Sequence, residues 1–193
     1  MLSNKLSKYT IILASNSPRR QELIKSLDIP FTVKIKEVKE VYPKELKQAE
    51  ITDYLSTLKA SPFKSELQEN DLLITSDTIV WSNNKALGKP KNYEEAFNMI
   101  KELSNATHKV ITSICITNKS FQHVFNDTTT VTFRELLDEE INYYITNYKP
   151  FDKAGAYGIQ EWIGKIGITK IEGSYFNVMG FPVHKLYKEL SKL

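Results

Sequence analysis

Residues 11–23, IILASNSPRRQEL, predict a buried strand, a polar turn and the first turns of a helix. Three consecutive aliphatic residues open the stretch, and further apolar residues follow the turn at helical spacing. Ser17 is a favourable helix N-cap, and Pro18 suits the first helical position, where its missing N–H has no helical partner to lose. We therefore expect a strand over residues 9–14 and a helix over residues 18–27.

Two arginines, Arg19 and Arg20, fall in the first turn of that helix, beside backbone N–H groups and the positive end of the helix dipole. Two cations at this position repel each other, and a bound anion relieves the repulsion. Arginine also has a planar fork of donors that binds phosphate oxygens. Two interpretations stand at this point: a phosphate site, or a capped surface helix with two solvated arginines.

Composition places the chain among ordinary globular proteins. Its 193 residues are 41% hydrophobic and 25% charged, which suits one domain, or one domain with two lobes. The net charge of +3 is mild and no Lys/Arg run occurs, so nucleic-acid binding is not indicated. Neither a signal-peptide pattern nor a membrane-spanning apolar run is present, so a soluble cytoplasmic protein is expected. The single Cys115 lies in an apolar run, which predicts a buried, unreactive thiol.

Strand and helix patterns interleave along the rest of the chain. Further strands are expected at 31–38, 72–81, 108–117, 121–133 and 166–171, with a short one around Ile159. Helices are expected at 44–60, 93–103, 137–148 and 183–190, with a turn at 82–85 and a loop at 87–90. The strands at 108–117 and 121–133 are expected to pair antiparallel. The pattern predicts a mixed α/β domain with hairpins in its second half.

Asp77 is the most informative acidic residue, because it interrupts an apolar strand. An uncompensated carboxylate there costs several kcal/mol, so Asp77 is expected to have a partner. The partner is a metal ion, a basic side chain or backbone N–H groups, and a purely structural ion pair is the simplest alternative. Carboxylates suit Mg²⁺ or Mn²⁺, which bring substrate phosphates as further ligands.

Two lysines have ordinary explanations when each is taken alone. Lys89 stands between Gly88 and Pro90 in a stiff, tight loop, where it either faces a ligand or is solvated. Lys59 lies near a helix C-terminus, where the dipole favours a cation. They become candidate site residues only because Arg19, Arg20 and Asp77 already indicate a phosphate and a metal.

Residues 151–160, FDKAGAYGIQ, combine small residues with an aromatic one, which permits close backbone approach to a flat ligand. Gln160 then has a donor and an acceptor to offer a base edge, although a plain turn with a packed tyrosine explains the pattern equally well. His108, His123 and His184 stand far apart without metal-ligand spacing, which favours structural roles.

Five stretches in register resemble the signatures of the Maf family of nucleoside triphosphate pyrophosphatases. They are residues 15–23, 76–80, 88–90, 152–160 and 173–182, and they span nearly the whole chain. Departures from the family pattern are small: Ser76 stands where alanine is commoner, and Asn105-Ala106 replaces a glycine-containing turn. The resemblance implies one Maf-like domain over 1–193, an elongated mixed sheet with flanking helices, and two lobes around a central cleft, as in inosine-triphosphate pyrophosphatases.

The resemblance also implies hydrolysis of a nucleoside triphosphate between its α- and β-phosphates, with a divalent metal (Mg²⁺ or Mn²⁺) as cofactor. Arg19, Thr78 and Gln160 are similar to the branch that acts on dTTP and UTP. The expected partners are the nucleotide substrate, with no nucleic acid and no membrane, while a homodimer is left open. The alternative is a non-catalytic nucleotide-binding regulator of cell division, as the family's association with septum formation suggests.

Site residues follow from the same resemblance. Asp77 matches the catalytic acidic residue, and Glu40 matches one of the family's other polar cleft residues. On physical grounds Asp77, with Glu40, is expected either to hold the metal or to accept a proton from the water. Base specificity is assigned to Arg19, Thr78 and Gln160, which mark the dTTP/UTP branch. The residues expected to bind the phosphates are Ser15, Ser17, Arg19, Arg20, Lys59 and Lys89.

Overall fold

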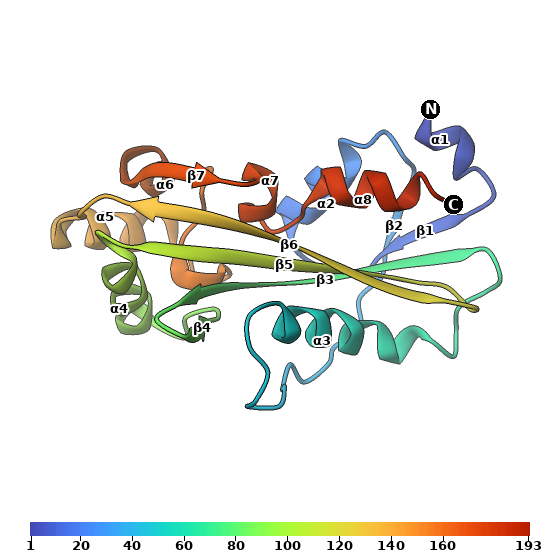
Figure 1. The fold of residues 1–193 in the computed structure, drawn as a ribbon, viewed down its shortest axis with the longest axis horizontal. Helices are drawn as coiled ribbons and strands as arrows, with labels where there is room; N and C mark the ends of the chain where they lie inside the picture. The colour runs from blue at the N-terminus through green and yellow to red at the C-terminus, as the bar shows by residue number, and fades with distance from the viewer. The chain divides into compact units, whose positions relative to one another are not determined.

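The computed structural model describes all of residues 1–193 and contains one seven-stranded sheet flanked by helices (Figure 1). The strands are β1 Thr10–Leu13, β2 Thr32–Val33, β3 Asp71–Ser82, β4 Lys85–Leu87, β5 Thr107–Thr117, β6 Gln122–Phe133 and β7 Ile168–Glu172. The helices are α1 Leu2–Lys5, α2 Pro18–Lys25, α3 Ala49–Ala60, α4 Tyr93–Leu103, α5 Asp138–Tyr148, α6 Trp162–Gly167, α7 Tyr175–Val178 and α8 Val183–Leu190. Short 3₁₀ turns occupy Ser61–Phe63 and Ala154–Ala156.

The sheet has the order β2-β1-β3-β5-β6-β7, with β4 paired beside β3. The chain divides into two compact units. The first unit comprises Met1–Asp77, Thr112–Asp127 and Gly180–Leu193, and the second comprises Thr78–Ile111 and Thr128–Met179. Strands β3, β5 and β6 therefore contribute residues to both units.

Parallel pairing of β1 organises the first unit. β1 pairs with β2, where Ile12 lies opposite Thr32, and with β3, where Ile12 lies opposite Leu73. Ile11, Ile12 and Leu13 are each at most 2% exposed. Figure 1 shows α3 on one side of these strands and α2 and α8 on the other, which explains why three successive residues are buried.

The second unit packs α4 and α5 beside one large apolar core. That core includes Ile100 of α4, Ile141 of α5 and Phe133 of β6, each at most 2% exposed. β4 forms an antiparallel hairpin with β3, in which Trp81 lies opposite Ala86. β7 pairs antiparallel with β6, although α5 and α6 lie between these two strands in the sequence.

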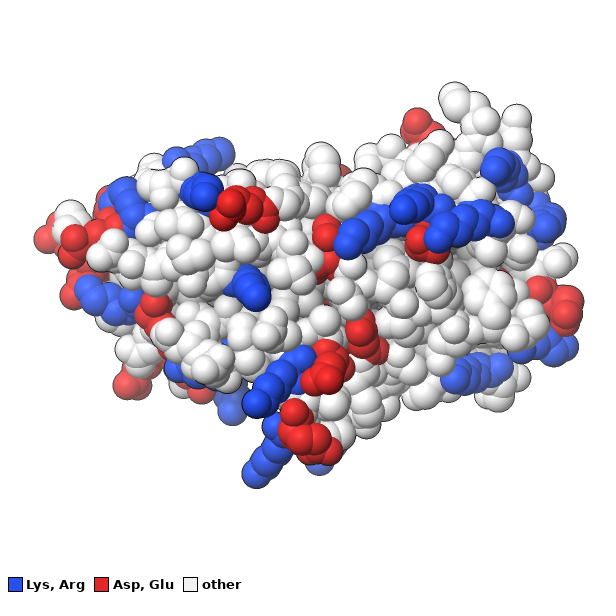
Figure 2. All heavy atoms as spheres, viewed as in Figure 1, with Lys and Arg blue, Asp and Glu red and all other residues white.

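Charges of both signs are interspersed on the face shown in Figure 2. Basic side chains gather over α8, but acidic ones stand among them, and Lys192 pairs with Glu189 at 2.6 Å. No helix is both long and apolar enough to cross a membrane. Cys115 is buried and makes no disulfide, as predicted.

Several predicted elements were wrong. The strand predicted at 31–38 shrinks to Thr32–Val33, because β2 is the sheet edge and its alternating apolar residues stay exposed. The helix predicted from residue 44 begins at Ala49. The stretch 82–90, predicted as turn and loop, contains β4. No strand forms around Ile159: this residue lies in a turn that precedes α6.

Candidate active site

The turn between β1 and α2 is fixed by its own hydrogen bonds. Ser17 caps α2, its Oγ accepting the backbone N–H of Arg20 at 3.4 Å, and Pro18 takes the first helical position as predicted. Ser15 Oγ accepts the N–H of Ser17 at 3.2 Å, and Gln21 donates to the Ser15 carbonyl at 3.1 Å. Because both serine oxygens act as acceptors here, each hydroxyl keeps its hydrogen for donation to an anion.

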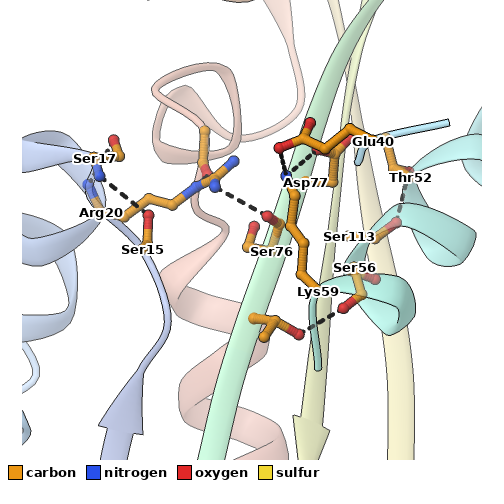
Figure 3. Close-up of polar contacts among 12 residues, drawn as sticks. Ser15, Ser17, Arg20, Glu40, Thr52, Ser56, Lys59, Ser76, Asp77 and Ser113 are labelled. Atoms are coloured by element: carbon orange, nitrogen blue, oxygen red, sulfur yellow. Dashed lines mark hydrogen bonds and ion pairs between the residues drawn. The ribbon is translucent and has the colours of Figure 1, made fainter. Parts of the chain in front are cut away.

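Arg20 ties this turn to two other segments of the first unit (Figure 3). Its Nε donates to the Gly180 carbonyl at 2.9 Å, and its Nη1 donates to the Ser76 carbonyl at 3.0 Å. Burial lowers the pKa of the Arg20 guanidinium, and the nearby charge of Asp77 opposes this effect. Two of the five guanidinium N–H donors therefore bind backbone carbonyls, one of them that of Ser76, the residue before Asp77.

Asp77 has a basic partner, one of the three alternatives that its burial allows. Its Oδ1 lies 2.6 Å from Lys59 Nζ, and the same ammonium lies 3.1 Å from Glu40 Oε1. The side chain of Asp77 is 8% exposed and that of Lys59 is 17% exposed, whereas Glu40 is 47% exposed. Figure 3 shows both carboxylates converging on the lysine. Three segments distant in sequence thus meet at one cationic group.

The donor set at this point fits a hard divalent cation. No group of three or more His, Cys, Asp or Glu side chains suited to a metal is found in residues 1–193. Mg²⁺, however, is commonly held by one or two carboxylates, with substrate phosphates and water as its other ligands. Asp77 and Glu40 already face the same positive charge, so these two carboxylates are the residues that fit a metal.

Hydroxyl groups that the sequence reasoning missed hold α3, which carries Lys59, against the sheet. Thr75 of β3 donates to the Ser56 carbonyl at 2.7 Å, and Ser113 Oγ of β5 lies 2.6 Å from Thr52 Oγ1 (Figure 3). Thr52, Ser56, Thr75 and Ser113 are all fully buried. Small hydroxyl residues on an otherwise apolar helix face are the sequence signal that could have identified this contact.

The second unit contains Thr78, Lys89 and Gln160. Thr78 directly follows Asp77 in β3, at the point where the chain passes from the first unit to the second. The N–H of Gly155 donates to the Gly88 carbonyl at 3.0 Å, so the Lys89 loop is bonded to the loop that carries Gln160. Gln160 is half-buried, and its Oε1 has no hydrogen-bond partner.

The three histidines lie beside different partners. His108 Nε2 is 2.7 Å from the Tyr157 hydroxyl, His123 is 3.1 Å from Glu189, and His184 is 3.6 Å from Asp127. These contacts agree with the structural roles that their spacing predicted.

All seven remaining predicted site residues belong to the first unit: Ser15, Ser17, Arg19, Arg20, Glu40, Lys59 and Asp77. Of these, hydrogen bonds and ion pairs join Glu40, Lys59 and Asp77 into one group, and join Ser15, Ser17 and Arg20 through the α2 turn. The bond from Arg20 to the Ser76 carbonyl connects the α2 turn to β3, the strand that carries Asp77.

Comparison with known proteins gives both family and fold. The family model described as "Maf-like protein" matches residues 10–193. The "dTTP/UTP pyrophosphatase" of Flavobacterium johnsoniae is 60% identical over 193 residues, covering 100% of both chains. The protein of the same name from Christiangramia forsetii is 56% identical, covering 100% of this chain and 98% of the relative.

Solved structures with much lower identity share the architecture. The Ham1 protein of Staphylococcus aureus matches with a TM-score of 0.55 and 16% identity, over 95% of this chain and 98% of that one. A HAM1 protein from Coxiella burnetii matches with a TM-score of 0.52 and 15% identity, over 96% and 100% of the two chains. The predicted mixed α/β sheet with helices is therefore confirmed as a fold that these proteins share.

Proposed function

We propose that this chain, which belongs to the family of Maf-like proteins, hydrolyses dTTP and UTP to the nucleoside monophosphate and pyrophosphate. The observation that carries the proposal is its 60% identity, over the full length of both chains, to a protein named dTTP/UTP pyrophosphatase. The ion pairs of Lys59 with the buried Asp77 and the exposed Glu40 support it, since a fixed carboxylate beside a cation suits phosphate chemistry.

Asp77 is the proposed proton acceptor. Attack of water on the α-phosphorus requires removal of a proton, and a carboxylate held in one place is suited to take it. The Lys59 ammonium, 2.6 Å away, and the Arg20 bond to the Ser76 carbonyl fix Asp77 from two directions. The O–P bond to the β-phosphate breaks as the water oxygen bonds to the α-phosphorus, and pyrophosphate leaves.

Triphosphate binding is assigned to the cations and hydroxyl groups that match the family's phosphate residues. In the first unit, Ser15 and Ser17 donate hydroxyl hydrogens, and the charges of Arg19 and Lys59 neutralise phosphate oxygens. Arg20 adds its charge while two of its donors hold the backbone. In the second unit, Lys89 contributes a further positive charge toward the leaving pyrophosphate.

Mg²⁺ or Mn²⁺ is the proposed cofactor, with Asp77 and Glu40 as its protein ligands. Bound there, the ion supplies positive charge that offsets the charge developing on the phosphate oxygens. The chain's own contribution is to bring two oxygen donors to one place: β3 supplies Asp77, and the long segment between β2 and α3 supplies Glu40.

Base choice is assigned to Arg19, Thr78 and Gln160. The Gln160 amide has a donor and an acceptor, and its buried Oε1 lacks a protein partner, which suits it to a base edge. We expect the protein to act on free nucleotides in the cytoplasm, without nucleic acid.

The test is a panel of common and modified nucleoside triphosphates, assayed for pyrophosphate and for inorganic phosphate with and without Mg²⁺ or Mn²⁺. We expect pyrophosphate from dTTP and UTP, only with metal present, and slower release from purine nucleotides. Release of single phosphate groups, or equal rates on every base, would contradict the proposal. Tight, metal-dependent binding without any product would favour the non-catalytic regulator.

A further inference from the structure

The loop of residues 152–161 is held from behind by one buried tyrosine of α5. Tyr144 is 0% exposed, and its hydroxyl accepts the N–H of Gly158 at 3.0 Å. The same hydroxyl donates to a carboxylate oxygen of Glu161. Gly158 and Glu161 flank Gln160 in the sequence, so a single hydroxyl holds the backbone before this residue and the side chain after it.

We propose that Tyr144 is a positioning residue for base selection, which sets the place of Gln160 through Gly158 and Glu161. The inference rests on the proposed function, because it deepens the role given there to Gln160. Tyr144 lies in none of the five family-like stretches, and neither the sequence reasoning nor the comparisons give it a role.

Glu161 is restrained at both of its carboxylate oxygens. Oε2 accepts from Tyr144, and Oε1 lies 3.1 Å from the Nζ of Lys153. The Lys153 side chain is only 8% exposed, and it also pairs with Asp152 at 2.7 Å. The beginning and the end of the loop are thereby joined through one ammonium and one carboxylate. Rotation of the Glu161 side chain would break a buried ion pair, so the Tyr144 hydroxyl has a fixed partner.

The side chains of Glu161 and Lys153 pack closely against Gly158. A Cβ added at Gly158 would lie 2.9 Å from Cδ of Glu161 and 3.1 Å from Cε of Lys153. Burial, reinforced by the Glu161 carboxylate, raises the pKa of the Tyr144 hydroxyl, which therefore stays a donor at neutral pH.

Residues 152–157, the earlier part of the loop, are held by contacts that do not involve Tyr144. The Tyr157 hydroxyl lies 2.7 Å from His108 Nε2, and the N–H of Gly155 bonds to Gly88. Neither contact reaches residues 158–161. Within residues 158–161, the N–H of Glu161 bonds to the Gly158 carbonyl at 3.1 Å and Ile159 is buried in the core. The Tyr144 hydroxyl adds the contacts that reach from α5 to both sides of Gln160.

Tyr144→Phe is the direct test, because it removes the hydroxyl and keeps the ring that stacks on Tyr148. The measured quantity is kcat/KM for dTTP divided by kcat/KM for dGTP. We expect this ratio to fall at least about fivefold, since an unsatisfied buried donor and acceptor release the loop. Tyr143→Phe is the matched control: it lies on the same helix and is 50% exposed, and its ratio should stay within about twofold of wild type.

A double variant separates positioning from a general structural effect. If Tyr144 acts through Gln160, then Tyr144→Phe adds no further loss of selectivity to Gln160→Ala. Additive losses, or an unchanged ratio in Tyr144→Phe, would overturn the inference while the wild-type activity stands. Should Tyr144→Phe fail to fold, Glu161→Met removes the acceptor of the same contact and should lower the ratio as well. Wild-type protein that releases no pyrophosphate from dTTP would instead overturn the proposed function and this inference with it.

Discussion

Replacing Lys59 with methionine would remove the one ammonium that faces two carboxylates, while a side chain of similar length remains. Asp77, with its side chain 8% exposed, would lose its partner at 2.6 Å and could not turn to water. Glu40 is 47% exposed and can be hydrated instead, so its lost contact at 3.1 Å adds little. The expected loss of stability is therefore set by Asp77.

Breaking a fully buried ion pair by removal of one partner costs about 3–5 kcal/mol. Because Lys59 is 17% exposed, some water reaches the pair, and we expect the lower part of this range, about 3 kcal/mol. For a chain of 193 residues this corresponds to a fall in Tm of roughly 6–12 °C.

Urea unfolding at pH 7, followed by circular dichroism, measures this difference directly. Lys64→Met is the matched control, since Lys64 is exposed and bonds only to Gln122 at 3.1 Å, and it should cost less than about 0.5 kcal/mol. Adding Asp77→Asn to Lys59→Met should restore part of the loss, because no unpaired carboxylate then remains buried. The reasoning fails if Lys59→Met unfolds as late as Lys64→Met.

Two further predictions concern the second unit. Burial lowers the pKa of His108 to about 4 from 6.5, so the unfolded chain takes up a proton at a higher pH than the folded protein does. The free energy of unfolding that this group contributes above pH 6.5 is therefore lost as the pH falls toward 4. The total loss is about 3 kcal/mol, because each tenfold change in proton affinity corresponds to ~1.4 kcal/mol. Denaturant titrations between pH 4 and 6.5 give the free energy of unfolding at each pH. Its dependence on pH should be weaker in His108→Gln than in wild type, but unchanged in the exposed His184→Gln. An equal pH dependence in all three proteins would contradict this prediction. Gly155→Ala places a Cβ 2.7 Å from Val80 Cγ2 at a φ of +67°, and should cost about 2–3 kcal/mol by thermal unfolding. Gly88→Ala should leave the stability nearly unchanged, because a Cβ added there has no atom within 4 Å. If Gly155→Ala were equally mild, Val80 would have to move aside at little cost, contrary to this prediction.

Local chemistry decided which parts of the fold were predictable. Ser17 and Pro18 marked the start of α2, since a cap and an N1 proline act within one turn. Val33 and Ile35 alternate with polar residues like a half-exposed strand, but β2 lies at the sheet edge and both residues are more than a third exposed. Alternation alone does not reveal how many neighbours a strand has, so the length of β2 was not predictable.

At the site, too, the sequence predicts local requirements but not which residue from another element meets them. A carboxylate at Asp77 requires a partner wherever it is buried, and this need was readable from the sequence. That Lys59 fills it depends on how α3 lies on β3, which is set by buried hydroxyl bonds such as Thr75 to Ser56. Tyr144 falls within the predicted helix 137–148, whose periodicity explains its ring and says nothing of its hydroxyl.

In the proposed reaction, Asp77 activates water for cleavage between the α- and β-phosphates. The most direct test of this role is the rate of pyrophosphate release from dTTP by Asp77→Asn, together with dTTP affinity measured by calorimetry. Asp71→Asn, in the same strand, is the control. We predict that Asp77→Asn loses at least about a hundredfold in kcat while dTTP still binds, and that Asp71→Asn does not. Turnover by Asp77→Asn within about tenfold of wild type would contradict the account.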